Sequence, residues 1–519
     1  MHKRNFLFLA PGFFLVFVFV FVSCSKSKQS ALPQDGSDLS QLEAPLSKFD
    51  QVMYLLKLGY VDELPTDSMQ DIAIAEMVRQ LDPHSCYIPA KDIEDVNSEL
   101  SGSFYGVGIQ FSIQDDTVSV ISVIHGGPSE KVGLMPGDKI VEVDDSAFVG
   151  KSITNERVLH TLRGEKGTRV KLGVRRTGAK DLLHYTVVRG EVPVKSVDAS
   201  FIIDGTHIGY ICVNKFGETT YDEYMAALAN LRRQGAKSYI IDLRQNSGGY
   251  MEQAVQMANE WLDKDQMIVY AEGRAYPRYE AKAQGNGRFR SEPLVVLIDG
   301  FSASATEIFS GAMQDNHRAT IIGQRSFGKG LVQQQIPLPD GSAIRMTVAR
   351  YYTPSGRCVQ KPYKLGDQDD YDQDLVERYE HGEFFNADSI HADGGIIPDI
   401  FVPRDTSYST PYANRLINLA YTYQFAYRYV EQHRAELSQY RDWKSLERYL
   451  RQQDLMKELA AYAQSKGLKP EPAQIAKSKQ YLLRLVRAYI VRDMLGDEAF
   501  FPLYMRDDEA MHRAVQKLR

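Results

Sequence analysis

Three apolar runs in the middle of the 519-residue chain constrain its fold most. They span residues 238–243, 294–298 and 319–322, and a loop containing glycine follows each of them. Strands that are apolar on both faces are typical of parallel sheets covered by helices, and helical patterns separate these runs. The sequence therefore predicts an α/β domain whose three loops meet at one edge of the sheet, where open α/β sheets bind ligands.

Changes in composition divide the chain into six segments. An uncharged apolar run between a basic start and a polar stretch is typical of a secretory leader, and the polar stretch after it is typical of a flexible tether. The remaining segments alternate between helical and β-rich patterns. The predicted segments are a leader (1–23), a tether (24–45), a helical segment (46–100), a β-rich domain (101–190), the α/β domain (191–404) and a helical appendage (405–519).

The end of the leader resembles a bacterial lipoprotein processing site. A small residue, Ser23, precedes Cys24, although Phe21 stands where leucine is usual. The resemblance implies that Cys24 carries a lipid, and hence an exported cell-envelope lipoprotein that faces the periplasm, with the choice of membrane open. An ordinary signal peptide next to an incidental cysteine, or a signal anchor, are the alternatives.

Composition excludes several classes of function. The net charge of -6 supplies no basic surface for nucleic acid. Beyond Cys24, the three cysteines Cys86, Cys212 and Cys358 lie far apart in the sequence. They predict neither a metal site nor a disulfide framework, and no cofactor is implied.

Residues 101–190 resemble a PDZ domain. Gly106-Val107-Gly108-Ile109, preceded by Tyr105, is similar to the glycine-rich carboxylate-binding loop, and residues 133–140 match the turn and strand that follow in that family. Glycines allow consecutive N–H groups to converge on a carboxylate, and the next strand edge can pair with an extended peptide. We expect the loop from Tyr105 to Gly108, including Val107, to bind a peptide C-terminus; a glycine-rich hairpin without a ligand is the alternative.

Two residues in the loops of the α/β domain carry candidate chemistry. Ser304 follows one buried run and precedes a helical pattern, and a helix N-terminus favours the negative charge that develops on a nucleophile. Ser304-Ala305-Thr306-Glu307 also fits a capping box, so an ordinary helix cap is the alternative. Lys329 lies between two glycines, and burial could lower its pKa from ~10.4 to ~7 at a cost of ~4 kcal/mol.

Two other kinds of site are compatible with parts of this region, a P-loop and a Ser–His–Asp triad. Residues 323–329 fit the first seven positions of a P-loop, but Gly330 cannot supply the hydroxyl that binds Mg²⁺, and the next segment alternates like a strand. His317 near Asp315 suggests a Ser–His–Asp triad, although no spacing brings His317 to Ser304. Both readings rank below the serine–lysine pair.

Several segments together resemble the carboxyl-terminal processing (tail-specific) serine proteases. The matching segments are 242–249, 301–309, 323–333, 352–356 and 395–400, with Asp315 at a family position of supporting role. The resemblance covers about residues 46–403 and leaves 405–519 unexplained. It implies an α/β protease core (a mixed β-sheet with helices), an inserted PDZ-like β-rich domain, and helical segments at both ends.

The resemblance also implies the roles of individual residues. Ser304 would be the nucleophile and Lys329 the general base, which Gln333 would orient. The backbone N–H groups of Ala305 and Gly249 would form the oxyanion hole.

The resulting hypothesis is an exported serine endopeptidase. It would capture proteins or peptides with free C-termini through its PDZ domain, without metal or cofactor, and be held to the membrane by its N-terminal lipid; a homo-oligomer is left open. The alternative is a periplasmic peptide-binding scaffold that has lost its chemistry, and the presence of both Ser304 and Lys329 argues against it.

Overall fold

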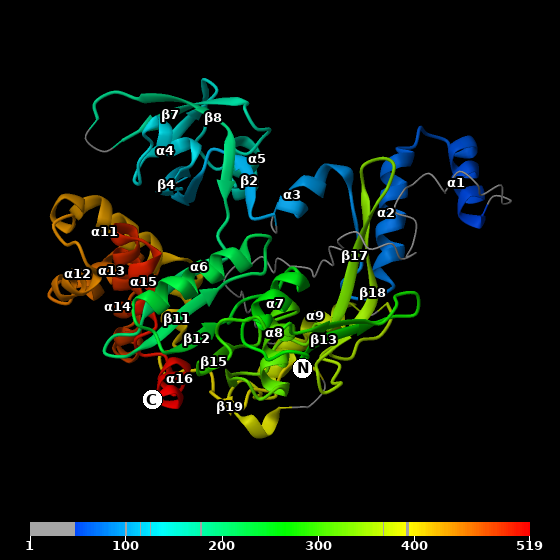
Figure 1. Ribbon diagram of the computed structural model, residues 1–519. Helices are drawn as coiled ribbons and strands as arrows, with labels where there is room; N and C mark the ends of the chain where they lie inside the picture. Colours follow the sequence, from blue (N-terminus) through cyan, green and yellow to red (C-terminus); the bar gives the residue numbers. More distant parts are fainter. Residues whose placement is uncertain are drawn as a thin grey trace, which may run out of the picture.

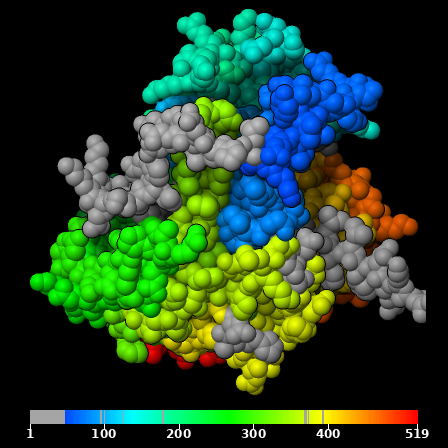
Figure 2. Space-filling view, turned by 90° about the vertical axis from the view of Figure 1, so that its right-hand side faces the viewer, coloured from blue at the N-terminus to red at the C-terminus, as the bar shows by residue number. Residues whose placement is uncertain are grey.

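The computed structural model describes residues 47–98, 101–114, 116–124, 126–176, 179–366, 368–390 and 394–519. The predicted leader, the tether and Cys24 lie outside the described residues. Figure 1 shows a PDZ-like domain, an α/β core and a set of C-terminal helices. In the space-filling view of Figure 2, the PDZ-like domain lies at the top of the molecule. The predicted fold class is confirmed. No helix within the described ranges is long and apolar enough to cross a bilayer.

The N-terminal helical segment is joined to the core by one short strand. Strand β1 (Cys86–Ile88) pairs antiparallel with β18 (Ala343–Tyr352), and Cys86 lies opposite Arg345. The helices before and after β1 are α1 (Lys48–Gly59), α2 (Thr66–Arg79), the short η2 (Ala90–Asp92) and α3 (Ile93–Ser98). Residues far apart in the chain therefore share one sheet close to the loop that contains Lys329.

The PDZ-like domain is inserted through a two-stranded neck. Strands β2 (Ser103–Gly106) and β9 (Gly190–Pro193) form this neck as an antiparallel pair. The domain's sheet has the order β3-β4-β5-β7-β8, with β6 paired to β5, so β3 is an edge strand. Its elements are β3 (Ile109–Gln114), β4 (Thr117–Val123), α4 (Pro128–Val132), β5 (Lys139–Val143), β6 (Ser146–Ala147), α5 (Asn155–Leu162), β7 (Arg169–Arg175) and β8 (Leu183–Val188).

The central sheet of the core contains the three predicted apolar runs. Its order is β10-β11-β12-β15-β16-β19, and only β10 runs antiparallel to its neighbour. Every residue of β11, β12 and β15 is buried, as expected of strands covered on both faces. The strands are β10 (Val197–Ile202), β11 (Ile208–Val213), β12 (Ser238–Asp242), β15 (Leu294–Ile298), β16 (Thr320–Gly323) and β19 (Ile400–Phe401).

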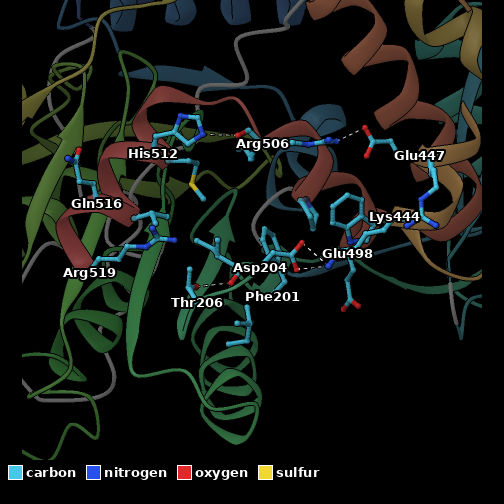
Figure 3. A pocket seen from close by; sticks show the side chains of 18 of the residues that line it. Phe201, Asp204, Thr206, Lys444, Glu447, Glu498, Arg506, His512, Gln516 and Arg519 are labelled. Atoms are coloured by element: carbon cyan, nitrogen blue, oxygen red, sulfur yellow. Dashed lines mark hydrogen bonds and ion pairs between the residues drawn. The ribbon is translucent and has the colours of Figure 1, made fainter. Parts of the chain in front are cut away.

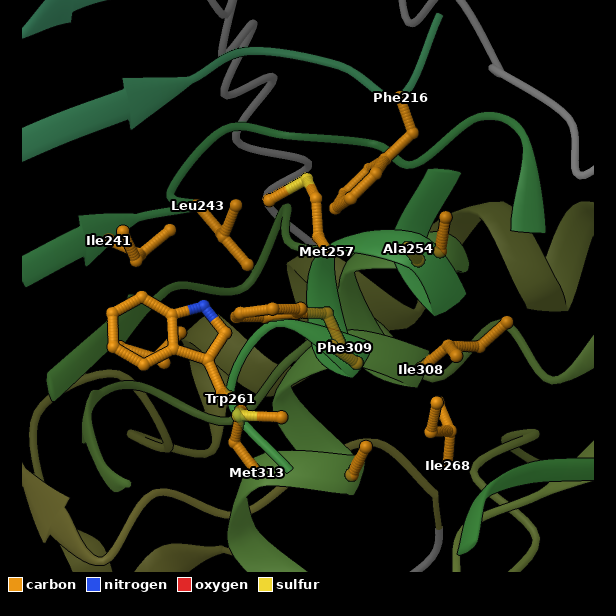
Figure 4. Packing of buried hydrophobic residues seen from close by; sticks show 14 of the residues in the cluster. Phe216, Ile241, Leu243, Ala254, Met257, Trp261, Ile268, Ile308, Phe309 and Met313 are labelled. Atoms are coloured by element: carbon orange, nitrogen blue, oxygen red, sulfur yellow. The ribbon is translucent and has the colours of Figure 1, made fainter. Parts of the chain in front are cut away.

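A second sheet lies beside the first, with the order β1-β18-β13-β14 and β17 paired to β18. Its other strands are β13 (Met267–Glu272), β14 (Tyr279–Lys282) and β17 (Leu331–Pro337). Between the sheets pack α6 (Thr220–Arg233), α7 (Met251–Asn259) and α8 (Ala305–Asp315). Figure 4 shows Phe309 of α8 packed in this core near Trp261 and Met257, so α8 is an internal helix.

The C-terminal helices form an apolar core of their own and also cover the outer face of the central sheet. Ala510, Met511 and Ala514 pack with residues of β12 and β15, and Arg244 pairs with Asp508 at 2.7 Å. The helices are α10 (Pro411–Asn418), α11 (Tyr421–Leu437), α12 (Trp443–Leu450), α13 (Leu455–Ser465), α14 (Pro472–Leu495), α15 (Asp497–Tyr504) and α16 (Glu509–Leu518). The appendage is therefore part of the folded core, which the sequence did not indicate.

A cavity of about 1080 Å³ opens where these helices meet the edge of the central sheet. Figure 3 shows Phe201 and Asp204 on one side, Lys444 and Glu447 on another, and Arg519 near the chain end. None of the predicted site residues lines this cavity.

Candidate active site

Ser304 occupies a strained turn between β15 and the internal helix α8. Its backbone angles are φ 60° and ψ -116°, a region that costs a residue with a side chain about 1–3 kcal/mol. Strand-to-helix turns of this kind present the nucleophile in some hydrolases. The side chain is completely buried, and among the described residues its hydroxyl has no hydrogen-bond partner. Strain and an unpaired buried hydroxyl together single out Ser304 as the candidate nucleophile.

Ser302, two residues earlier, is a useful contrast because its hydroxyl is fully used by the fold. Its Oγ donates to the carbonyl oxygen of Leu243 at 2.8 Å and accepts from the N–H of Asp299 at 2.9 Å. Ser302 therefore ties the loop after β15 to the loop after β12.

Lys329 is buried, with 1% of its surface exposed. Burial, together with the positive charge of Arg345, lowers its pKa to about 7, while Glu307 opposes the shift. An amine with this pKa is substantially neutral near pH 7 and can accept a proton. Lys329 is therefore not a solvated surface lysine.

The carboxylate of Glu307 joins the loop of Ser304 to the loop of Lys329. Its Oε2 accepts from the N–H groups of Ser304 and Lys329, both at 2.8 Å. Its Oε1 accepts from the N–H of Gly328 at 2.7 Å and from the hydroxyl of Ser326 at 2.5 Å. Burial raises the pKa of Glu307 to about 7, although these four hydrogen bonds act in the opposite direction.

A tyrosine makes a parallel connection on the carbonyl side. The hydroxyl of Tyr351 contacts the carbonyl oxygens of both Ser304, at 3.0 Å, and Lys329. Glu307 and Tyr351 thus both bind the backbones of Ser304 and Lys329 and hold them side by side.

Glu307 also settles the P-loop alternative. The N–H groups of Gly328 and Lys329, which a P-loop would direct at phosphate, are directed at this buried carboxylate. The segment that follows is strand β17 instead of a helix. The nucleotide-binding reading is therefore wrong.

Gln333 lies on β17, four residues after Lys329, and is 1% exposed. Neither its amide oxygen nor its amide nitrogen has a hydrogen-bond partner among the described residues. A bulge between Val332 and Gln333 interrupts the pairing with β18, and bulges redirect side chains next to active sites. A buried amide without partners is costly, which is consistent with a partner that arrives during the reaction.

The glycine loop after β12 contacts Ser304 directly. A Cβ on Gly248 would lie 2.7 Å from the Cβ of Ser304 and 3.0 Å from the N of Ala305, so only glycine fits. Phe216 donates to the carbonyl of Gly248 at 2.9 Å and accepts from Tyr250 at 2.7 Å, which points the N–H of Gly249 away from Phe216. The N–H of Ala305, at the start of α8, belongs to the first turn and has no acceptor within the helix.

Asp315 lies at the opposite end of α8. An 11-residue helix is about 16 Å long, so Asp315 does not reach Ser304. Its carboxylate accepts from the N–H and hydroxyl of Ser355, at 3.0 and 2.6 Å, and pairs with Arg357. Burial acts to raise the pKa of Asp315, but these interactions bring it below its usual value. His317 lies in the turn after the same end, so the structure brings neither residue to Ser304.

The predicted carboxylate loop connects the neck strand β2 with the edge strand β3. Val107 is buried, Tyr105 is exposed, and Gly108 has a φ of 77°. The carbonyls of Val107 and Gly108 accept from Ser129 and Ile124 at 2.9 and 3.0 Å. They are therefore used inside the domain. On β3, the half-buried side chains of Ile109, Phe111 and Ile113 pack against the domain core.

Groups from other segments of the chain surround Lys329, and no pattern in the sequence indicates them. His84 is buried, and its Nε2 lies 3.0 Å from the hydroxyl of Tyr371 on α9 (Gln368–Glu380). Burial and the charges of Lys329 and Lys361 hold the pKa of His84 well below its usual value. The helical pattern of residues 46–100 does not indicate that His84 is buried.

Metal chemistry finds no support in the described part of the chain, where no group of three His, Cys, Asp or Glu side chains could hold an ion. The described cysteines are unpaired.

Family models match both the α/β core and the inserted PDZ-like domain. The model of peptidase family S41 matches residues 207–372, and that of the PDZ domain matches 106–187. A family of unknown function (DUF8443) matches residues 412–496.

Known relatives agree with these matches. The chain is 34% identical over 412 residues to a carboxy-terminal-processing protease of Bartonella bacilliformis. The aligned region covers 76% of this chain and 92% of that protein. It is 35% identical over 319 residues to the carboxy-terminal processing protease CtpA of Bacillus subtilis, with 61% and 67% covered. Among solved structures, the photosystem II D1 C-terminal processing protease is 27% identical, with 68% and 87% covered and a TM-score of 0.37. The chain belongs to the carboxy-terminal processing proteases of peptidase family S41.

Proposed function

We propose that this peptidase is an exported serine endopeptidase that captures the C-terminal tails of proteins and cleaves them with Ser304 and Lys329. The observation that carries the proposal is the shared clamp. A strained, buried serine with an unpaired hydroxyl and a buried lysine of lowered pKa are attached to the same carboxylate, Glu307.

In the proposed reaction, the neutral amine of Lys329 takes the proton of Ser304 as its Oγ attacks the carbonyl carbon of the scissile bond. The N–H groups of Ala305 and Gly249 stabilise the oxyanion, a contribution of about 3 kcal/mol for each donor. The lysine ammonium then protonates the leaving amine, and an ester of Ser304 remains. Water activated by the neutral lysine hydrolyses the ester. The amide oxygen of Gln333 is available to accept from the ammonium while it carries the extra proton.

The PDZ domain is the proposed capture site. Among the strands of the described residues, β3 pairs only with β4 and leaves one edge open, so an extended peptide can add a strand there. The loop from Tyr105 to Gly108 begins this edge, and the free carboxylate of the substrate would bind at it. This arrangement selects chains by their C-terminus.

Export and membrane attachment rest on the sequence of the leader. Lipidation of Cys24 would hold the enzyme at the cell envelope. If it does, Cys24→Ser releases the protein from the membrane fraction or leaves it unprocessed, as fractionation and intact mass would show. Normal processing with membrane retention would indicate a signal anchor.

Labelling with a serine-reactive fluorophosphonate tests the catalytic proposal. We expect the probe to label the wild type and the Ser302→Ala variant and to leave Ser304→Ala unlabelled, with circular dichroism confirming that each variant is folded. Labelling of Ser304→Ala would place the nucleophile elsewhere. Absence of labelling and of proteolysis in the wild type would favour the peptide-binding scaffold.

A further inference from the structure

Tyr427 is buried on a C-terminal helix without belonging to the core of those helices. It lies on α11 and is 1% exposed. The described apolar cluster of the C-terminal helices includes its neighbours Phe425 and Tyr429 but does not include Tyr427. Another part of the molecule must therefore cover this ring. Its hydroxyl lies 3.5 Å from the carbonyl oxygen of Val120, on β4 of the PDZ domain.

The matching surface of the PDZ domain is the outer face of β4 and β5. Val118 and Val120 point into the domain core, so Ser119 between them points to the opposite face. Ser119 is nevertheless completely buried, which means that this face is covered as well. Lys139 of β5 pairs directly with Ser119, so the two side chains are neighbours on the covered face.

A second contact follows one helical turn along α11. Residues 427 and 431 lie on the same face of the helix, and the carboxylate of Glu431 lies 3.9 Å from the Nζ of Lys139. Two successive turns of α11 thus contact two neighbouring strands. Figure 1 shows the C-terminal helices next to the PDZ domain on the side of β4.

The contact with α11 matters because the neck between the PDZ domain and the core is thin. The chain passes between the two through the strands β2 and β9, and a two-stranded ribbon is only marginally stable by itself. The neck alone would leave the orientation of the domain loosely defined. The contact with α11 is a second attachment between the PDZ domain and the rest of the molecule.

We propose that α11 is the docking surface of the PDZ domain, and that docking orients the open edge of β3 so that a captured tail is delivered to the protease core. This inference rests on the proposed function, because it assigns to the C-terminal helices a part in presenting the substrate. A docked domain has fewer orientations to search, which raises the effective concentration of the tail at the active site.

A charge-swap experiment on the full chain tests the contact. The variants are Glu431→Lys, Lys139→Glu and the double swap, with Glu436→Lys as a matched control on the exposed side of the same helix. We expect hydrogen exchange of residues 117–123 and 139–143 to be roughly 2- to 5-fold faster in each single variant. The double swap should restore it, and the control should match the wild type. Unchanged exchange in both single variants, or no recovery in the double swap, would overturn the docking surface.

Kinetics test the consequence for substrates. For a peptide with a free C-terminus, we expect kcat/KM to fall roughly 2- to 5-fold in each single variant and to recover in the double swap. The amidated peptide should be unaffected. Faster exchange with unchanged or higher kcat/KM for the free-acid peptide would overturn productive orientation. Exchange does not depend on catalysis, so this outcome is distinct from failure of the Ser304 assignment, which fluorophosphonate labelling reports separately. Tyr427→Ala, which removes the buried ring, should reproduce the exchange of the single variants.

Discussion

The lowered pKa of Lys329 predicts how activity depends on pH. A lysine of pKa 10.5 is about 0.03% neutral at pH 7, whereas one of pKa about 7 is about half neutral. The structure therefore increases the amount of usable base by roughly 1,000-fold, which corresponds to about 4 kcal/mol. Because the neutral amine is the base in the proposed mechanism, kcat/KM should rise with pH through about 7 and level off above it.

A variant of Arg345 makes this prediction specific. After burial, the charge of Arg345 is the largest cause that lowers the pKa of Lys329. Arg345→Gln removes the charge and retains a polar side chain, so the pKa should rise and the pH profile should move to higher pH. Lys329→Arg should be inactive at every pH, because a guanidinium group stays protonated.

The assay is kcat/KM for a peptide substrate without ionisable groups near the cleaved bond, measured from pH 5.5 to 9.5 at constant ionic strength. Glu307 has a pKa of about 7 as well, so the acid limb can be steeper than a single protonation. A flat profile, an active Lys329→Arg enzyme or a shift of the Arg345→Gln profile to lower pH would refute the reasoning.

Three further predictions use other parts of the site. Because the pKa of Lys329 is lower in the folded state than in the unfolded chain, unfolding takes up protons between about pH 7 and 10.4, and stability is lowest below pH 7. Lys329→Met should therefore raise Tm more at pH 6 than at pH 9.5; an equal change at both would contradict this. Glu307→Ala should lower Tm and kcat together, since each buried donor left unpaired costs about 1–3 kcal/mol. If thermal melts show a lowered Tm while the activity assay gives the kcat of the wild type, the contacts of Glu307 are only structural. Amidating the C-terminus of a peptide substrate should weaken capture by roughly 10- to 100-fold in affinity, and equal cleavage of acid and amide at subsaturating concentration would argue against capture by the PDZ domain.

The parts of the fold that were predictable follow from continuous or local patterns. The near-continuous apolar runs predicted β12, β15 and β16, and the structure has all three as parallel neighbours. Their loops meet because the carboxyl ends of parallel strands lie at one edge. The glycine at 248 was readable as a turn, but its contact with the Cβ of Ser304 depends on a loop 56 positions further along the chain.

Contacts between distant segments were not predictable. The burial of Lys329 involves Arg345 and the segment around His84, which reaches the site only because β1 pairs with β18. The C-terminal helices looked like an appendage, because their amphipathic pattern does not reveal that the apolar face of α16 covers the central sheet. No sequence period encodes which surface a helix will cover.

The local sequence pattern around Glu307 predicts one of its contacts but not its contacts with the loop of Lys329. The sequence Ser304-Ala305-Thr306-Glu307 predicts a capping box, and the carboxylate does accept from the N–H of Ser304. In a cap, however, the hydroxyl of Ser304 would accept from the N–H of Glu307. This N–H donates instead to the carbonyl oxygen of Ser304 at 2.8 Å, and among the described residues the hydroxyl has no hydrogen-bond partner. The remaining lone pairs of the carboxylate bind Ser326, Gly328 and Lys329. A buried carboxylate is tolerated because four donors surround it. The carboxylate of Glu307, in the first turn of α8, thereby also holds the loops of Ser304 and Lys329 together. A change that preserves helix capping but shortens this side chain would therefore separate the two loops without unfolding α8.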